Sequence, residues 1–333
     1  MTTDILAIGD ITTDIFINIH EDNEHCLVDA KNEKLIFDFG EKIPYDSAET
    51  VKATGNGGNA AVSGARLGLS AALLSRIGDD KDGKECLDEL RKNNVDATLV
   101  RAESGKKTNC HYVLWYEVDR TILTRHENFS YEFGEVEPPR WIYLTSLPEN
   151  SLDFHNQIAD FAKKNPSVKL AFQPGTYQIK FGAEKLAEIY KRAEIFFCNV
   201  QEAREILRTS ETDLPTLLAE IAALGPKIVC VTDGINGAYA FDSVKNEKWF
   251  VPCYPGKPFE RTGAGDAFAS TVVAALALGE PLQTALLWAP INAMSVCLFV
   301  GAQKGLLTQE QISDYLAKAP GDYKLKKYKK KTA

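Results

Sequence analysis

Short apolar runs alternate with amphipathic stretches along most of this chain. The first run, 5–8, is closed by Gly9 and Asp10, as is typical of a buried parallel strand that ends in a turn. From Asn59 onward the alternation is regular. It predicts helices at 59–68, about 83–92, 151–164, about 200–208 and about 214–224, and strands at 71–75, 141–145, about 168–172, about 194–198 and 228–232. Such alternation predicts an α/β fold with a mostly parallel sheet flanked by helices.

Two stretches, about 15–53 and 108–125, have a different pattern of short strands interrupted by polar residues. They predict a small exposed sheet inserted into the main fold. The last eleven residues, 323–333, contain six lysines and no apolar period, which predicts a solvated, disordered tail. We therefore expect one main domain over residues 1–322, followed by this tail.

Composition narrows the class of protein. The chain has 333 residues, 44% of them hydrophobic, so it can bury a large core. Its net charge of -8 is unlike that of proteins that bind nucleic acid through a basic face, and it favours small-molecule chemistry. The seven cysteines form no Cys-x-x-Cys pair, which favours reduced thiols over disulfides or a zinc ribbon. Without a signal-peptide pattern or a membrane-span stretch, a cytoplasmic protein with no membrane partner is expected.

The most informative motif is Arg-Thr-Gly-Ala-Gly-Asp at 261–266, which runs directly into an apolar helical stretch at 267–276. Glycines ahead of a helix allow a concave turn whose free N–H groups attract an anion such as phosphate. A carboxylate at Asp266 fits there as the base that takes a proton from a hydroxyl attacking the phosphate. The alternative is that Thr262 and Asp266 only cap the helix.

A second glycine cluster lies at 55–61 and matches the Gly-x-Gly-x-x-Ala dinucleotide fingerprint. That fingerprint should follow a buried strand, whereas residues 48–54 are polar. Asn56 and Asn59 can instead offer donors and acceptors to ligand hydroxyls, or the segment is a structural turn before a helix. Residues 78–85 have the spacing of a phosphate-binding loop, but Glu85 replaces the metal-binding Ser or Thr, so a surface turn that caps the next helix is expected.

Two further segments follow predicted strands. Asn199 and Glu202 share a helix face and can hold a hydrated Mg²⁺, or they form a helix cap with Glu at its third position. Residues 231–237 end a strand in a polar glycine turn that can face a nucleotide, although most such turns are only structural.

With these four segments in this order, the chain resembles the ribokinase-like carbohydrate kinases of the PfkB family, which includes sugar and nucleoside kinases. The resemblance covers about residues 4–318. Residues 260–266 match the family's Asp-Thr-x-Gly-Ala-Gly-Asp signature, 55–68 match its glycine-rich first signature, and Asn199 with Glu202 matches its Asn-x-x-Glu motif. The resemblance implies a ribokinase-like, doubly wound sheet with a small β-sheet lid.

The resemblance also implies a function: ATP-dependent transfer of the γ-phosphate to a hydroxyl of a small sugar, or of a nucleoside as the alternative. Asp266 is then the general base, and the N–H groups of Gly263, Ala264 and Gly265 form the anion hole. The residues expected to bind the substrate are Asp14, Asn56, Gly57, Gly58 and Asn59. The residues expected to bind the nucleotide are Asn199, Thr232, Gly234, Thr262, Asn292 and Gly301, with Asn199 and Glu202 holding Mg²⁺ through water.

Some positions depart from the family pattern. Glu260 stands where many members have the Asp that helps to bind a monovalent cation, so potassium activation is left open. No arginine matches a site for a substrate phosphate, which favours an unphosphorylated acceptor. The lid implies a homodimer. Two remote alternatives are a dinucleotide-dependent oxidoreductase that uses the glycines at 55–60 and a sensor that binds ligand without catalysis.

Overall fold

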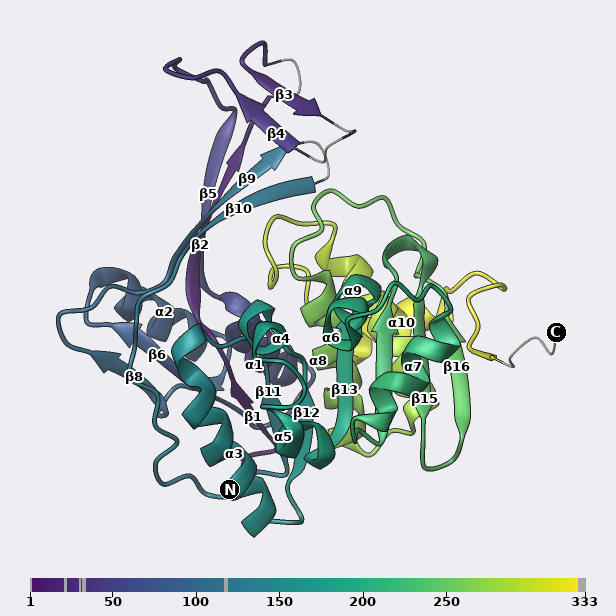
Figure 1. Cartoon of the computed structure of the whole chain (residues 1–333). Helices are drawn as coiled ribbons and strands as arrows, with labels where there is room; N and C mark the ends of the chain where they lie inside the picture. The colour runs from purple at the N-terminus through teal and green to yellow at the C-terminus, as the bar shows by residue number, and fades with distance from the viewer. Residues whose placement is uncertain (1, 21–22, 30, 32–33, 117–118, 329–333) are drawn as a thin grey trace.

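A large sheet runs through the centre of the molecule, with helices on both faces (Figure 1). The structure is a computed structural model that describes residues 2–20, 23–29, 31, 34–116 and 119–328. In spatial order, the strands of this main sheet are β17 (Lys326–Lys327), β16 (Glu247–Val251), β15 (Ala238–Asp242), β14 (Ile228–Thr232), β13 (Ala193–Asn199), β12 (Lys169–Phe172), β11 (Trp141–Leu144), β1 (Ile5–Ile8), β6 (Ala71–Gly78) and β7 (Val95–Asp96), with β8 (Val100–Glu103) also paired to β6.

Pairing is parallel from β14 through to β7 and antiparallel from β14 out to β17. The chain order reverses at β1, whose neighbours are β6 on one side and β11 on the other. This is the predicted doubly wound, mostly parallel sheet. Ligands of such sheets bind beyond the carboxyl ends of the strands at the reversal, which is the edge between β1 and β11.

The side chains of β1 alternate between two hydrophobic cores. Ile5 and Ala7 point to one core, and Leu6 and Ile8 point to the other. The first core lies under α1 (Gly55–Arg66), α2 (Lys81–Lys92), α8 (Ala264–Leu278), α9 (Leu282–Val296) and α10 (Gln309–Ala317). The second lies under α3 (Leu152–Lys164), α4 (Thr176–Phe181), α5 (Ala187–Arg192), α6 (Val200–Leu207) and α7 (Leu214–Ala223).

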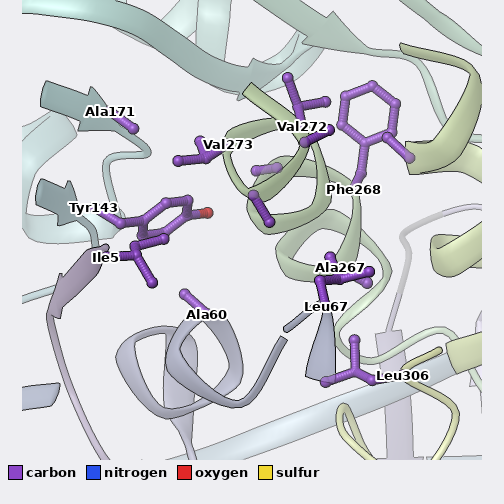
Figure 2. Packing of buried hydrophobic residues seen from close by; sticks show 14 of the residues in the cluster. Ile5, Ala60, Leu67, Tyr143, Ala171, Ala267, Phe268, Val272, Val273 and Leu306 are labelled. Atoms are coloured by element: carbon purple, nitrogen blue, oxygen red, sulfur yellow. The ribbon is translucent and has the colours of Figure 1, made fainter. Parts of the chain in front are cut away.

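Helix α8 packs directly on the centre of the sheet. Figure 2 shows Ile5, Tyr143 and Ala171, from three neighbouring strands, facing Val273 of α8, with Ala60 of α1 beside them. All five are at most 3% exposed. Because α8 packs on this buried apolar surface, the residues at its first turn have a fixed position at the edge of the sheet.

A second sheet, here called the lid sheet, projects from the main body (Figure 1). Its strands are β10 (Asp119–Arg125), β9 (Cys110–Tyr116), β2 (Thr12–Asn18) and β5 (Ser47–Thr54), in that order. The short strands β3 (Cys26–Asp29) and β4 (Lys34–Phe37) pair with each other beyond it. The predicted small exposed sheet is therefore confirmed, and it consists of the two stretches that the polar pattern singled out.

The glycine cluster is helical rather than a loop, so α1 begins at Gly55, four residues before the predicted start. A Cβ on Gly58 would lie 2.2 Å from the carbonyl oxygen of Ala53, and one on Gly57 would lie 2.8 Å from the backbone of Gly9. The glycines thus let α1 pack against backbone, and the space that a pyrophosphate would need is filled. This packing argues against the dinucleotide-dependent alternative.

Several elements differ from expectation. Helices α4 and α5 have only six residues each and carry too little periodic pattern to predict. The predicted tail is wrong in its first part, because Tyr323 is buried and its hydroxyl donates to Leu287 O at 2.6 Å, and β17 pairs with β16. Residues 329–333 lie outside the described part. Asp80 accepts from Gly83 N and caps α2, as predicted for the 78–85 turn.

None of the helices in the described part of the chain combines the length and the apolarity that a membrane span requires.

Candidate active site

Chemically active side chains meet at the sheet edge where the strand order reverses. Asp10 follows β1, Thr145 follows β11 and Gln173 follows β12. The first turns of α1 and α8 lie at the same edge, and β2 and β9 of the lid sheet continue from it. Segments that are far apart in the sequence therefore meet at this edge of the sheet.

Asp266 lies in the first turn of α8 and is 8% exposed. Its Oδ1 accepts hydrogen bonds from Asn56 Nδ2 at 2.8 Å and Gln173 Nε2 at 3.3 Å, and its Oδ2 accepts one from Asn59 Nδ2 at 2.8 Å. Neutral amides rather than a cation hold this carboxylate. The amides fix its orientation without cancelling its charge.

Burial raises the pKa of Asp266, and the negative charge of Asp14 adds to the rise. The hydrogen bonds from the two asparagines and Gln173 act in the opposite direction, because they favour the charged form. A carboxylate with a raised pKa and a fixed position is suited to take a proton from a hydroxyl group.

The loop before Asp266 has a rigid shape. Gly263 has φ of +81°, and a Cβ there would lie 2.2 Å from Ala302 Cβ. Helix α8 begins at Ala264, and the first N–H groups of a helix have no partner within it. The N–H of Ala264 donates to Arg261 O at 3.4 Å, and the N–H groups that follow it, with the positive end of the helix, are of the kind that attracts an anion.

Glu260 and Thr262 brace this loop. The backbone N–H of Thr262 donates to Glu260 Oε1 at 2.7 Å, and its hydroxyl, which was predicted to contact the nucleotide, donates to the same oxygen. Glu260 is fully buried, and its Oε2 has no hydrogen-bond partner among the described residues. An oxygen buried in this way is satisfied by a proton or a cation, so the loop is compatible with the monovalent cation left open above.

Asp14 lies on β2, at the root of the lid sheet. Its Oδ1 accepts from Thr12 Oγ1 at 2.8 Å and lies 3.2 Å from His111 Nδ1. Asp14 contributes to the raised pKa of Asp266, so the two carboxylates face one region, as predicted.

The glycines and Asn59 play a different part from the predicted one. The N–H groups of Gly57 and Gly58 donate to Asp10 O at 3.1 and 3.4 Å, so they bind the turn after β1 rather than a substrate hydroxyl. Asn59 accepts from Gln303 Nε2 at 3.1 Å while it donates to Asp266. Asn59 therefore positions the carboxylate, and both ends of its amide are in use.

On the other side of Asp266, Asn199 and Glu202 form a reciprocal helix cap. Asn199 Oδ1 accepts from Glu202 N and Glu202 Oε2 accepts from Asn199 N, both at 2.8 Å. Burial raises the pKa of Glu202, and the charge of Asp266 adds to the rise. Thr232 lies next to Asn199 in the sheet, and the turn after it begins with Gly234 at φ of +51°. The predicted nucleotide turn and Asn-x-x-Glu motif are thus side by side.

A metal held mainly by phosphates and water needs only one or two protein oxygens. In the part of the chain that the structure describes, no group of three or more His, Cys, Asp or Glu side chains is arranged to hold a metal. The cap uses Oε2 of Glu202, which leaves Oε1 of the same carboxylate for a metal-bound water. The residues present therefore fit a hydrated Mg²⁺ whose remaining ligands are phosphate oxygens.

Two residues predicted to bind the nucleotide make contacts within the protein. Asn292 is completely buried, with Nδ2 donating to Thr271 Oγ1 at 2.7 Å and Oδ1 accepting from Leu307 N at 2.9 Å. Gly301 is also buried, and a Cβ there would lie 3.2 Å from Val51 of the lid sheet. Both residues support packing behind the site.

Three residues at this edge were not predicted as site residues: Gln173, His111 and His126. Gln173 directly follows a predicted strand, which is a usable signal in a parallel sheet. His111 lies opposite Asp14 in the β2–β9 register, and this pairing is not visible in the sequence. His126 lies just beyond β10, and its ring centroid is 5.1 Å from that of His111.

Comparison with known proteins gives one family. The model of the pfkB family carbohydrate kinases matches residues 24–309. Ribokinase from Bacillus subtilis is 26% identical over 289 residues, which cover 84% of this chain and 92% of that protein. Cytidine kinase from Thermococcus kodakarensis is 28% identical over 261 residues, which cover 75% of this chain and 87% of that protein.

Solved structures agree on the fold. Arabidopsis thaliana ribokinase, complexed with ribose and ATP, has a TM-score of 0.76 at 20% identity and covers 95% of this chain and 99% of its own. A candidate Ribokinase II from E. coli, in complex with ATP and Mg²⁺, also has a TM-score of 0.76, at 18% identity, and covers 96% of this chain and 100% of its own. The ribokinase-like fold is thereby confirmed.

Proposed function

Because this chain belongs to the PfkB family of carbohydrate kinases, phosphotransferases with alcohol acceptors, we propose that it transfers the γ-phosphate of ATP to a hydroxyl of a small sugar. One observation carries the proposal: the buried carboxylate of Asp266, with its raised pKa, is held by three amides in the first turn of α8. A base beside a turn that attracts anions is the arrangement that phosphoryl transfer to an alcohol requires.

The proposed step balances without a further reactant. The acceptor hydroxyl gives its proton to Asp266 while its oxygen forms a bond to the γ-phosphorus. The bond between that phosphorus and the bridging oxygen breaks, and ADP leaves with the electron pair. N–H groups at the start of α8 stabilise the charge on the transferring group, and Asp14 binds a second hydroxyl of the acceptor.

We include Mg²⁺ in the proposal, with Glu202 and Asn199 near it through water. When bound, the ion would neutralise charge on the phosphates of ATP. The E. coli structure with ATP and Mg²⁺ supports this part of the proposal.

A nucleoside is the second candidate acceptor. The similarity to cytidine kinase from Thermococcus kodakarensis, which extends over 75% of this chain, supports it. Both acceptors present ribose-type hydroxyls, so the chemistry at Asp266 is the same for either.

We also propose a cytoplasmic homodimer that associates through the lid sheet. The seven cysteines are all free, which suits a reducing compartment. Large apolar side chains are exposed on the lid sheet and on the β3–β4 pair, among them Leu27, Val28, Phe39 and Leu123. Such a concentration of exposed apolar groups is typical of an interaction surface. Light scattering on the purified protein gives the mass directly, and a monomer would remove the dimer from the proposal.

An ADP-release assay tests the function. The protein is incubated with ATP, Mg²⁺ and a panel of sugars and nucleosides, each at several concentrations, and the phosphorylated product is identified by mass spectrometry. We expect ADP release that depends on one class of acceptor. ADP release that is the same with and without every acceptor would contradict the proposal.

A further inference from the structure

Two histidines and two aspartates form a cluster at this edge of the sheet, and the proposed transfer step uses only Asp14 of the four. His111 Nδ1 lies 3.2 Å from Asp14 Oδ1, and His126 Nδ1 lies 3.8 Å from Asp10 Oδ2. The two rings contact each other, with centroids 5.1 Å apart. These four residues, here called the Asp–His cluster, come from the turn after β1, from strands β2 and β9, and from the segment after β10.

The cluster contains polar atoms that the protein leaves unsatisfied. Within the described residues, His111 Nε2 and His126 Nδ1 are buried without a hydrogen-bond partner. The hydroxyl of Thr145 is also buried without a hydrogen-bond partner among these residues, and Thr145 packs beside Gly9, next to Asp10. Buried polar atoms are nearly always paired in folded proteins, so three unpaired ones at one edge point to a ligand that supplies the partners.

Hydroxyl groups are the partners that fit these atoms. His111 Nδ1 faces a carboxylate and carries the proton there, so in a neutral ring Nε2 is an acceptor. Burial is the main cause that lowers the pKa of His126, which favours the neutral form of this ring. Among the described residues, the polar contacts of Asp14 go to Oδ1, which leaves Oδ2 to accept from a ligand. A hydroxyl both donates and accepts, so vicinal hydroxyls can satisfy the set.

Charge at the cluster disfavours an anionic acceptor. Asp10 and Asp14 both present carboxylates, and Asp10 also accepts from the hydroxyl of Tyr131. Arg76 lies over the ring of Tyr131 at 5.8 Å, but its N–H groups donate to the carbonyl oxygens of Ser75, Ser130 and Glu132. This guanidinium is therefore committed to backbone and is not free to bind a phosphate or a carboxylate.

We propose that the Asp–His cluster selects the acceptor, with His111 and His126 as specificity-determining residues for a neutral compound with neighbouring hydroxyl groups. Sugar phosphates and sugar acids are rejected because the cluster presents two acidic side chains to them and the guanidinium of Arg76 is committed to backbone. This inference rests on the proposed kinase function and names the acceptor class of the same site. Because His111 lies on the lid sheet, acceptor binding also connects the lid to the main body.

Pairs of neutral and anionic acceptors test whether the cluster rejects negative charge. ADP release is measured with ribose against ribose 5-phosphate, fructose against fructose 6-phosphate, and glucose against gluconate, with adenosine and cytidine as further neutral acceptors. We expect the best acceptor to be neutral and any charged counterpart to have a kcat/KM at least 100-fold lower. An anionic compound as the best acceptor would overturn the inference and leave the kinase function standing.

Ring replacements test the two histidines. His111→Phe and His126→Phe keep the ring and remove its nitrogens, so we expect the KM for the acceptor to rise at least tenfold while the KM for ATP stays within twofold. H111Q returns a polar atom near the Nε2 position and should recover part of the loss. His25→Phe is the matched control, because His25 lies next to β3 and pairs with Asp38 at 3.0 Å, outside the cluster; it should change neither constant.

The outcomes distinguish the role of the Asp–His cluster from the proposed kinase function. Unchanged acceptor KM in both ring variants, or equal rises in the KM for acceptor and ATP, overturns the role of the cluster. No ADP release by the wild type with any acceptor overturns the proposed function, and this inference with it. Thermal unfolding is measured for every variant, and if H111F does not fold, H126F and H111Q decide the question.

Discussion

Replacing Gly263 by alanine probes the shape of the loop that carries the proposed anion hole. Gly263 has φ of +81°, a conformation that costs an L-residue about 1 to 2 kcal/mol. The new Cβ would lie 2.2 Å from Ala302 Cβ and 2.7 Å from Ala302 Cα, and ordinary contact begins at 3.4 Å. Ala302 is only 2% exposed and part of the contact is to backbone, so the loop itself must move by more than an ångström.

The expected magnitude follows from these contacts. Overpacking of this kind costs about 1 to 3 kcal/mol, so the free energy of unfolding should fall by about 2 to 5 kcal/mol in total. A domain with typical stability of about 5 to 15 kcal/mol remains folded after this loss. Because the N–H groups of Ala264 and Gly265 move with the loop, turnover should fall by a factor on the order of 100.

The assay pairs urea denaturation with ADP release, and the chain supplies a matched control. Gly265→Ala adds the same methyl group two residues further on, where no heavy atom lies within 4 Å and φ is not positive. Its free energy of unfolding should be unchanged or higher by up to about 1 kcal/mol. Unaltered stability in G263A would refute the packing argument, and lost stability with full turnover would refute the anion-hole role.

Two further predictions concern Glu202 and Asp10. Glu202→Gln keeps a side-chain oxygen for the helix cap but removes the charge. The Mg²⁺ concentration for half-maximal turnover should therefore rise several-fold while the thermal unfolding temperature is unchanged. An unchanged Mg²⁺ dependence would exclude Glu202 from metal binding. Burial raises the pKa of Asp10 from 3.8 to about 7, so the folded protein holds a proton that the unfolded chain has released. This group therefore lowers the free energy of unfolding as pH rises from about 4 to about 7, by up to about 4 kcal/mol, and Asp10→Asn should lose that part of the slope in urea denaturation at pH 4.5 and 7.5. Equal slopes in D10N and wild type would contradict the assignment.

The elements near α8 were predictable because their signals are local. A glycine pair before an apolar helix specifies a turn and a helix start within one short segment, whatever the rest of the chain does. The alternation of predicted helices and strands from Asn59 likewise reports burial of each segment, and it predicted the parallel strands β6 and β11 to β14 of the main sheet. Asp266 and Asn56 could be singled out for the same reason, since each lies in a short motif.

The remaining site residues depend on pairing between distant segments. His111 faces the site only because β9 lies beside β2 in the register that places it opposite Asp14. Asn292 satisfies a side chain and a backbone group from two other segments, and the sequence does not show those partners. Gly57 and Gly58 bind Asp10 O for a similar reason, since close packing of α1 on β1 determines their partners.

The central claim is that Asp266 accepts the proton of the attacking hydroxyl. Single-turnover transfer from labelled ATP to the acceptor found in the ADP-release panel, in wild type and Asp266→Asn, measures this step directly. The asparagine places one N–H₂ among three amide donors, so thermal unfolding and ATP binding are recorded on the same samples. We predict a transfer rate lower by about 100- to 10,000-fold with ATP affinity within about threefold of wild type. Transfer at the wild-type rate in the folded variant would contradict the account.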